Sequence, residues 1–162
     1  MRHMIFATLS AFLLTVSGVQ AGHHEENEKP PVIGMGLSAA GDSKALYAGK
    51  LSNMKIWEEY IKAHNDRDFE KIASMNAANF SVVMANGQRV DGSEAQRETL
   101  EAWIEESNTT WEIQWIIPNN AENDDGEMEE WLATGQMLTM TDDEGNISME
   151  YHLVDVKLDE GK

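Results

Sequence analysis

Two residues near the C-terminal end of the chain could perform acid-base chemistry. His152 and Glu150 are two positions apart in segment 147–158, which reads as a strand, so both side chains lie on one face of it. A histidine beside a carboxylate can act as a general base, because imidazole takes up and releases protons near neutral pH. His152 is therefore a candidate catalytic residue, and the competing interpretation is a hydrogen-bonded or exposed pair without a catalytic role.

A second histidine, His64, falls at the end of the first predicted helix. The C-terminal end of a helix favours positive charge, so we expect His64 to face water or the helix terminus. The folded part of the sequence shows no metal-binding cluster, Gly-rich phosphate loop or nucleophile motif. We therefore expect neither a metal nor a cofactor.

Aromatic and sulfur-containing side chains are numerous, with five tryptophans and ten methionines in the chain. Most of the tryptophans occupy periodic positions typical of a core or an interface. A subset could line an apolar pocket, because aromatic walls bind flat ligands and methionines adapt to irregular shapes. The candidate ligand-binding residues are Trp57, Met84, Trp103, Trp131 and Val154.

Two helices are predicted to open the folded region. Apolar residues recur at three- and four-residue spacing over 51–64, which is typical of an amphipathic helix with Ser52 or Asn53 as its N-cap. A shorter helix is predicted over 69–75, with acidic residues near its start, where the helix dipole favours negative charge.

A hairpin and a third helix follow. Segment 80–84 is rich in β-branched residues, Asn86–Gly87 is a hairpin turn signal, and segment 88–90 returns. Ser93 is predicted to cap the third helix through a capping box with Gln96.

The remainder of the chain is predicted to form an antiparallel sheet. Segment 111–117 alternates with apolar residues at the odd positions, and 118–126 reads as an acidic, Asn-rich loop. Long strands are predicted over 128–141 and 147–158. Three helices followed by such strands indicate an α+β domain. Both faces of 147–158 are apolar, and one is free to meet a second subunit, so we expect a homodimer.

The N-terminal segment indicates export. A short basic start, an apolar run and the small residues around Gln20 are typical of a secretory signal peptide over 1–21, and we expect a periplasmic or secreted protein, from a bacterium. Residues 22–46 contain prolines, glycines and few apolar residues, so we expect a flexible linker. The folded domain is then 47–162. The sequence contains no cysteine, so it uses no disulfide.

The formal net charge of −17 bears on the partners. Phosphate backbones and anionic membrane surfaces bind basic protein surface, so we expect neither a nucleic acid nor a membrane as partner. We interpret the acidity as a solvated surface, and an acidic face that recruits a basic partner is the alternative.

Three stretches of the chain, 60–72, 80–84 and 90–95, resemble the opening of the nuclear transport factor 2-like superfamily, which includes SnoaL-like polyketide cyclases and ketosteroid isomerases. The resemblance covers about residues 55–162. It implies a curved sheet that wraps around helices into a cone with a buried pocket, often dimerising through the sheet. It also implies another strand after 159–162, so we expect the sequence to be a fragment that lacks its last strand.

The ketosteroid isomerase pattern implies roles at three positions. Tyr60 falls on the tyrosine that donates a hydrogen bond to the developing oxyanion. The position of the base carries Met84, whose thioether cannot take a proton. The second carboxylate falls near Val154, with Asp155 one residue away and therefore on the opposite strand face. The resemblance thus argues against classical isomerase activity.

Two functions remain. The one we favour is an exported small-molecule-binding or accessory protein of the SnoaL-like type, which holds a small apolar molecule, because the chain lacks a complete isomerase set. The alternative is a cofactor-independent cyclase, isomerase or dehydratase that uses Tyr60 with His152 or Asp155. The enzyme requires Tyr60 and His152 to face one cavity, whereas the binding protein requires a largely apolar cavity.

Overall fold

A computed structural model describes residues 30–38 and 40–159 of the chain. The predicted signal peptide, 1–21, lies outside the described residues. The helices are η1 (Leu51–Asn53), α1 (Met54–Asp66), α2 (Phe69–Met75) and α3 (Ser93–Ser107). The strands are β1 (Val32–Leu37), β2 (Ser43–Ala48), β3 (Ser81–Val83), β4 (Arg89–Asp91), β5 (Thr110–Glu122), β6 (Met128–Thr141) and β7 (Ile147–Leu158).

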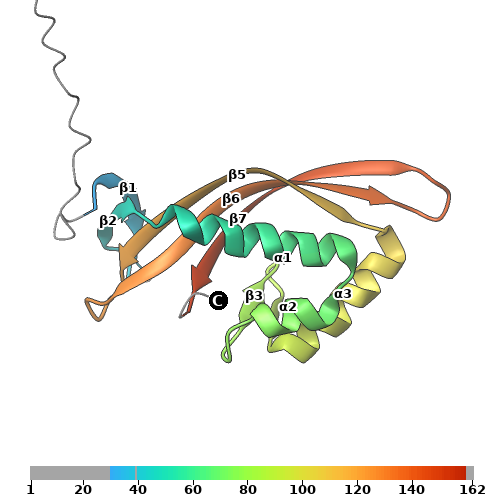
Figure 1. Cartoon of the computed structure of the whole chain (residues 1–162), viewed down its shortest axis with the longest axis horizontal. Coiled ribbons are helices and arrows are strands. Elements are labelled where there is room, and N and C mark those ends of the chain that lie inside the picture. Colours follow the sequence, from blue (N-terminus) through green and yellow to red (C-terminus); the bar gives the residue numbers. More distant parts are fainter. Residues whose placement is uncertain (1–29, 39, 160–162) are drawn as a thin grey trace, which may run out of the picture.

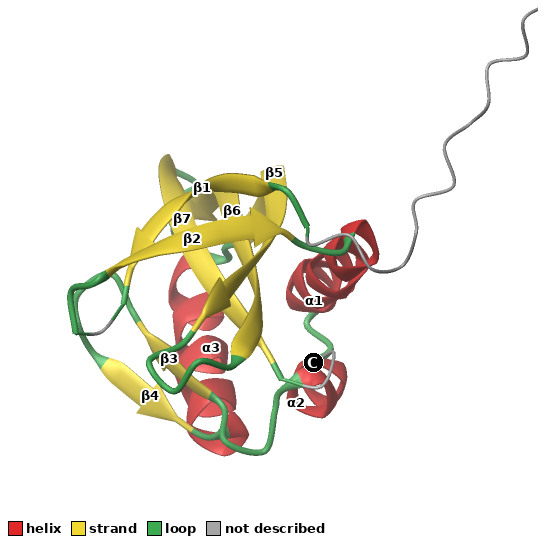
Figure 2. Cartoon of the chain, turned by 90° about the vertical axis from the view of Figure 1, so that its left-hand side faces the viewer, coloured by secondary structure: helices red, strands yellow, loops and turns green. Residues whose placement is uncertain are grey.

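A five-stranded antiparallel sheet in the order β1-β2-β5-β6-β7 is the largest element, and β3 and β4 form a separate hairpin. The three α-helices lie on one side of the curved sheet (Figure 1). Figure 2 shows α3 inside the curve, with the β3–β4 hairpin beside it. The sheet does not close on itself. The predicted α+β class, a curved sheet packed on three helices, is confirmed.

The expectation of a flexible linker over 22–46 is wrong for its described part, because β1 and most of β2 lie there. Gly34 and Gly36 are not linker residues: the Leu46 side chain packs over both of them, and a Cβ at Gly36 would meet it at 3.5 Å. The hairpin joins the sheet through β2, which pairs with the end of β5. Residues 118–122, where the sequence predicts a loop, belong to β5 and pair with β6 along their whole length.

The helix boundaries follow local chemistry, with two corrections. The α1 helix ends at Asp66, because the next residue, Arg67, has a positive φ of 60°. Asp68 caps α2 by accepting a hydrogen bond from the Lys71 amide at 3.0 Å. Asn53 makes no cap hydrogen bond, since its backbone is already helical, and its side-chain amide donates to Glu130 at 3.0 Å. The predicted capping box at Ser93 is absent as well, because Ser93 accepts a hydrogen bond from another part of the chain.

A bulge in β5 changes which residues face the helices. The pairing register shifts between Ile113 and Trp115. Trp111 is buried, but Trp115 and Ile117, which the alternation places on the same face, are exposed. A one-residue insertion reverses the side-chain faces of a strand, so the second half of β5 presents apolar residues to the outer face.

The core lies between the inner face of the sheet and the helices. Leu132 and Leu138 of β6 are fully buried, and residues of α1, α2, α3, β5 and β7 pack around them; the buried members of this cluster are Trp57, Ile61, Ala63, Ile72, Leu100, Trp111, Leu132, Leu138 and Leu158. Among the described residues, no helix is long and apolar enough to cross a membrane.

Candidate functional site

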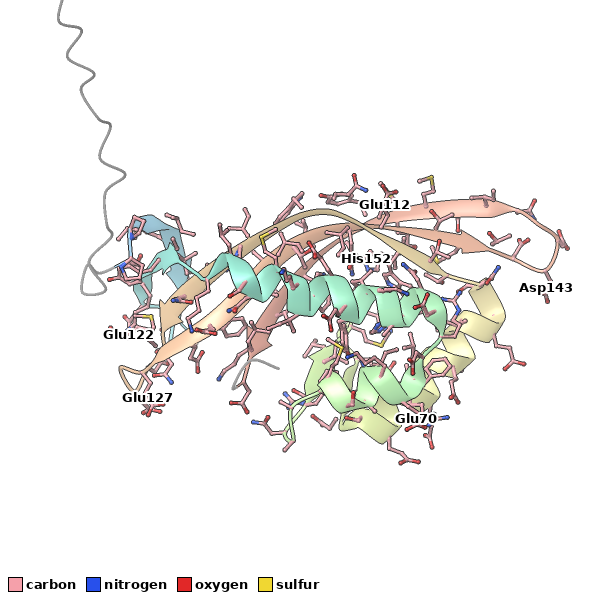
Figure 3. The ribbon with its side chains drawn as sticks, viewed as in Figure 1. Glu70, Glu112, Glu122, Glu127, Asp143 and His152 are labelled. Atoms are coloured by element: carbon pink, nitrogen blue, oxygen red, sulfur yellow. The ribbon has the colours of Figure 1, made fainter. Side chains whose placement is uncertain are left out.

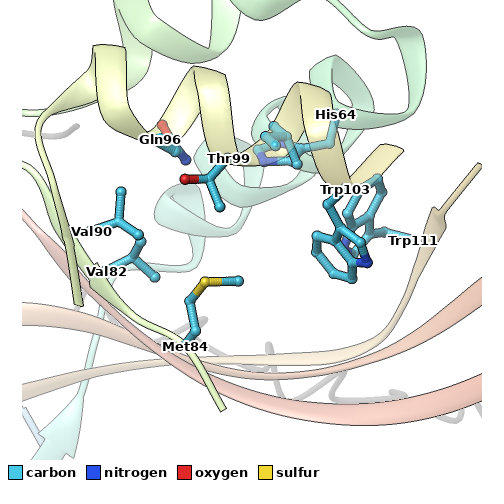
Figure 4. A pocket seen from close by; sticks show the side chains of 9 residues that line it. His64, Val82, Met84, Val90, Gln96, Thr99, Trp103 and Trp111 are labelled. Carbon is cyan, nitrogen blue, oxygen red and sulfur yellow. The ribbon is translucent and has the colours of Figure 1, made fainter. Parts of the chain in front are cut away.

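A cavity of about 130 Å³ lies between α3, the β3–β4 hairpin, the end of α1 and the start of β5. Its wall is mainly apolar and aromatic, and His64, Gln96 and Thr99 add polar atoms to the N–H groups of the two indoles. The lining residues are His64, Val82, Met84, Val90, Gln96, Thr99, Leu100, Trp103 and Trp111. Figure 4 shows Met84 on one side of this space, with His64 and Thr99 across from it and Trp103 and Trp111 at one end.

Trp111 is held at the cavity by a side chain of α1. The amide of Asn65 donates to the Trp111 carbonyl at 2.8 Å, and its oxygen accepts from the Trp111 N–H at 2.8 Å. The Asn65 side chain thus makes the two backbone hydrogen bonds to Trp111 that a neighbouring strand would otherwise make. The indole then packs edge-on against Trp103, with ring centres 5.6 Å apart. The start of β5 is therefore fixed to the end of α1.

His64 does not face water, as the sequence predicts, but lines the cavity with 7% of its surface exposed. Its Nδ1 lies 2.8 Å from the Tyr60 carbonyl oxygen, one turn earlier in α1. A carbonyl only accepts hydrogen bonds, so Nδ1 carries the proton. Burial lowers the pKa of His64 below its usual 6.5, although the bond to the Tyr60 carbonyl opposes this shift. The ring is therefore neutral at pH 7.

Tyr60 belongs to a closed polar network beside the cavity. Its hydroxyl donates to Asn76 Oδ1 at 3.0 Å and accepts from Gln96 Nε2 at 2.6 Å. Asn76 in turn donates to Gln96 Oε1 and to Ser93. Burial raises the pKa of Tyr60 to about 12, although the bond from Gln96 lowers it. The Tyr60 proton is thus bound within the protein, and Tyr60 is not among the residues that line the cavity.

The ligand-binding candidates divide into two groups. Met84 and Trp103 line the cavity. Trp57 and Val154 belong to the core instead, where Trp57 stacks on Tyr60 at 5.3 Å between ring centres. Trp131 lies on β6, where its Nε1 donates to Glu129 at 3.2 Å. None of these three is among the lining residues.

The two catalytic candidates of β7 lie on opposite faces of the strand. His152, which is labelled in Figure 3, shares the inner face with Val154. Its Nε2 is 2.9 Å from Glu150. Asp155 is exposed on the outer face. Neither residue lines the cavity, so the described structure does not gather Tyr60, His152 and Asp155 around one space.

A second, larger hollow of about 430 Å³ lies at the far end of α3. Residues of the β6–β7 hairpin and the last turn of α3 line it, and Glu106 and Asp142 make it acidic. Trp103 borders both spaces. The first cavity combines a buried histidine with aromatic walls, which makes it the candidate site.

The sequence does not single out Gln96, Thr99 and Leu100 as lining residues, although a signal is present. Gln96, Thr99 and Trp103 are three and four residues apart on α3 and so share a helix face. The Gln96 side chain therefore lies on the helix face that lines the cavity, and it does not form the predicted capping box. The acidic side chains labelled in Figure 3 are instead spread over the surface, on α2, β5 and two hairpin turns.

No protein-family model matches the sequence, and no curated protein matches it. Among solved structures, the chain is similar to Aln2 from a Streptomyces species, with a TM-score of 0.51 and 18% sequence identity. The matched region covers 64% of this chain and 74% of Aln2. At this identity the likeness is one of fold, and the chain therefore shares its α+β architecture with Aln2.

Proposed function

We propose that this chain is an exported small-molecule-binding or accessory protein of the SnoaL-like type, in the nuclear transport factor 2-like superfamily, and that the cavity beside α3 holds its ligand. The similarity to Aln2 supports the fold that this proposal needs. The observation that carries the proposal is the aromatic and apolar lining of the cavity around one buried, neutral histidine.

The size of the cavity sets the size of the ligand. A dry apolar cavity of about 150 Å³ in another protein is known to bind benzene. A volume of about 130 Å³ that is partly open to solvent therefore suits a molecule with at least a single ring. Trp103 and Trp111 offer aromatic surface to such a ring, and Met84 can adjust to its outline.

The positions and hydrogen bonds of the candidate catalytic residues favour binding over isomerase chemistry. Tyr60 donates its proton to Asn76, so an oxyanion would have to break that bond. Met84 lines the cavity where the resemblance places a base. His152 and Asp155 lie elsewhere. The enzyme that we considered from the sequence therefore lacks a convergent acid-base set.

A cavity-filling variant tests the proposal. Val82 lines the cavity, whereas its neighbour Val83 is 63% exposed on the other face of β3. We expect small aromatic molecules such as toluene or phenol to change the tryptophan fluorescence of the wild type. Val82→Phe should weaken this binding at least about tenfold, because the added ring occupies the space, and Val83→Phe should not. Equal binding by both variants would place the ligand elsewhere.

We also propose a homodimer and an extracytoplasmic location. The outer face of the sheet carries exposed apolar residues on β5 and β7, which suit a second copy of the chain; these are Trp115, Ile117, Ile147, Met149, Tyr151 and Leu153.

Export rests on the signal peptide expected over 1–21. Fractionation of cells that express the full chain should find a shortened protein outside the cytoplasm, and an uncleaved cytoplasmic chain would contradict export.

A further inference from the structure

We infer that His64 is the hydrogen-bond acceptor of the cavity and that the site selects small aromatic molecules carrying a hydroxyl or N–H donor over purely apolar molecules of the same size. This inference rests on the proposed function, since it describes the ligand of the same cavity. Phenol represents the preferred class, and toluene is its match without a donor.

The position of the His64 proton determines what the ring offers a ligand. Nδ1 donates to the Tyr60 carbonyl, so in the neutral ring Nε2 has a free lone pair. The two nitrogens lie on different sides of an imidazole. Because Nδ1 points back along α1, Nε2 points away from that hydrogen bond. Within the described residues Nε2 makes no hydrogen bond, although the ring is buried and lines the cavity.

The neighbouring rings hold His64 in this orientation. Tyr60 lies against one side, with ring centres 4.5 Å apart, and Trp111 meets the imidazole edge-on at 5.4 Å. A rotation of the ring would break the bond to the Tyr60 carbonyl and disturb both contacts. The acceptor is therefore fixed before a ligand arrives, which reduces the entropy lost on binding.

Among the other polar groups of the cavity wall, Thr99 adds a second acceptor for a donor ligand, and the side chain of Gln96 is tied to the Tyr60 network. Thr99 donates its hydroxyl proton to the Ala95 carbonyl at 2.8 Å, so it too presents an oxygen that can only accept. Gln96 uses its oxygen for Asn76 and one of its two amide N–H groups for Tyr60. His64 and Thr99, two of the polar side chains in the wall, thus offer acceptors.

An apolar ligand would bury the Nε2 lone pair without a partner. Such a group loses its water and gains nothing in return, whereas a phenolic hydroxyl replaces the lost hydrogen bond. A site whose wall presents an unpaired acceptor to the ligand therefore distinguishes ligands of equal size by their polarity. We expect phenol to bind about tenfold or more tightly than toluene.

Calorimetric titrations of the wild-type chain and His64→Phe with phenol, toluene and anisole test the inference. Wild type should prefer phenol to both others, because anisole has the oxygen but no proton. His64→Phe should bind toluene at least as well as phenol. Equal affinities of the wild type for phenol and toluene would overturn the inference and leave the apolar site intact. No detectable binding of any of the three would overturn the proposed function as well.

A measurement on the wild type alone covers the case in which His64→Phe does not fold. Nitrogen NMR of the imidazole should show the proton on Nδ1 in the free protein. Adding phenol should shift the Nε2 resonance, and adding toluene should leave it nearly unchanged. A proton on Nε2, or equal shifts with both molecules, would overturn the inference.

Discussion

Trp115 and Tyr151 meet over Gly135 on the outer face of the sheet, where the indole Nε1 donates to the tyrosine hydroxyl at 2.6 Å. The two residues come from β5 and β7, and the strand between them leaves room because Gly135 has no side chain. A Cβ at position 135 would overlap both the Tyr151 hydroxyl and the Trp115 indole. Gly135 is therefore required by this aromatic bridge rather than by its backbone conformation.

Gly135→Ala should push the Trp115 and Tyr151 side chains apart and lower the free energy of unfolding by about 1 kcal/mol. The cost stays moderate because both rings are partly exposed and can turn away. Urea denaturation measures the loss. In a Tyr151→Ala background the same change should cost less, because one of the overlapping groups is gone. An equal loss in both backgrounds would mean that the bridge does not set the residue at position 135.

Removing the Tyr60 hydroxyl from its polar network should lower the free energy of unfolding by more than Gly135→Ala does. Tyr60→Phe removes the hydroxyl and leaves Asn76 Oδ1 and Gln96 Nε2 without their partner in a partly buried place. We expect the free energy of unfolding to fall by about 1–2 kcal/mol, as measured by urea denaturation. Tyr151→Phe is the control, since Tyr151 is 49% exposed and the loss of its hydroxyl should cost less. The affinity for phenol should stay within about twofold of wild type, because Tyr60 does not line the cavity.

The same tyrosine predicts how stability depends on alkaline pH. Burial raises the pKa of Tyr60 from 10.0 to about 12, so the folded state holds its proton more tightly than the unfolded state. This contribution is fully present below pH 10 and is lost as the pH rises through about 12. The advantage of wild type over Tyr60→Phe should shrink by roughly 1 kcal/mol by pH 11. A constant difference between the two proteins from pH 8 to pH 11 would contradict this assignment.

Periodic segments made much of the fold predictable. The bounds of β6 and β7 agree with the predicted strands, because alternation over a dozen residues leaves little choice. The N-terminal hairpin was missed since Gly34 and Gly36 resemble linker residues until Leu46 packs over them. The bulge after Ile113 was missed for a similar reason, because it is set by pairing with β6.

The site was only partly predictable, because its burial is created by residues distant in the sequence. His64 ends a helix, where a histidine usually meets water, and it is buried by Trp111 of β5. Met84 was predicted from the position that the resemblance gives to the base, and Trp103 from the apolar face of the third helix. The ketosteroid isomerase pattern predicted Tyr60 as a hydrogen-bond donor to an oxyanion. Its hydroxyl donates to Asn76 instead, and no sequence pattern pairs these two residues.

The outer face of the sheet provides the last prediction. Leu153 is 71% exposed on β7 and lies opposite Gly135, next to the aromatic bridge. If two copies associate through this face about a two-fold axis, Leu153→Glu places a carboxylate at equivalent places on both subunits. Burying these charges without partners should abolish the dimer, while the fold tolerates them on an exposed face. Sedimentation should find wild type at twice the chain mass and Leu153→Glu at the chain mass. Val83→Glu, which is similarly exposed but on the separate hairpin, should remain dimeric. A wild-type chain that sediments as a monomer at every concentration would contradict the dimer.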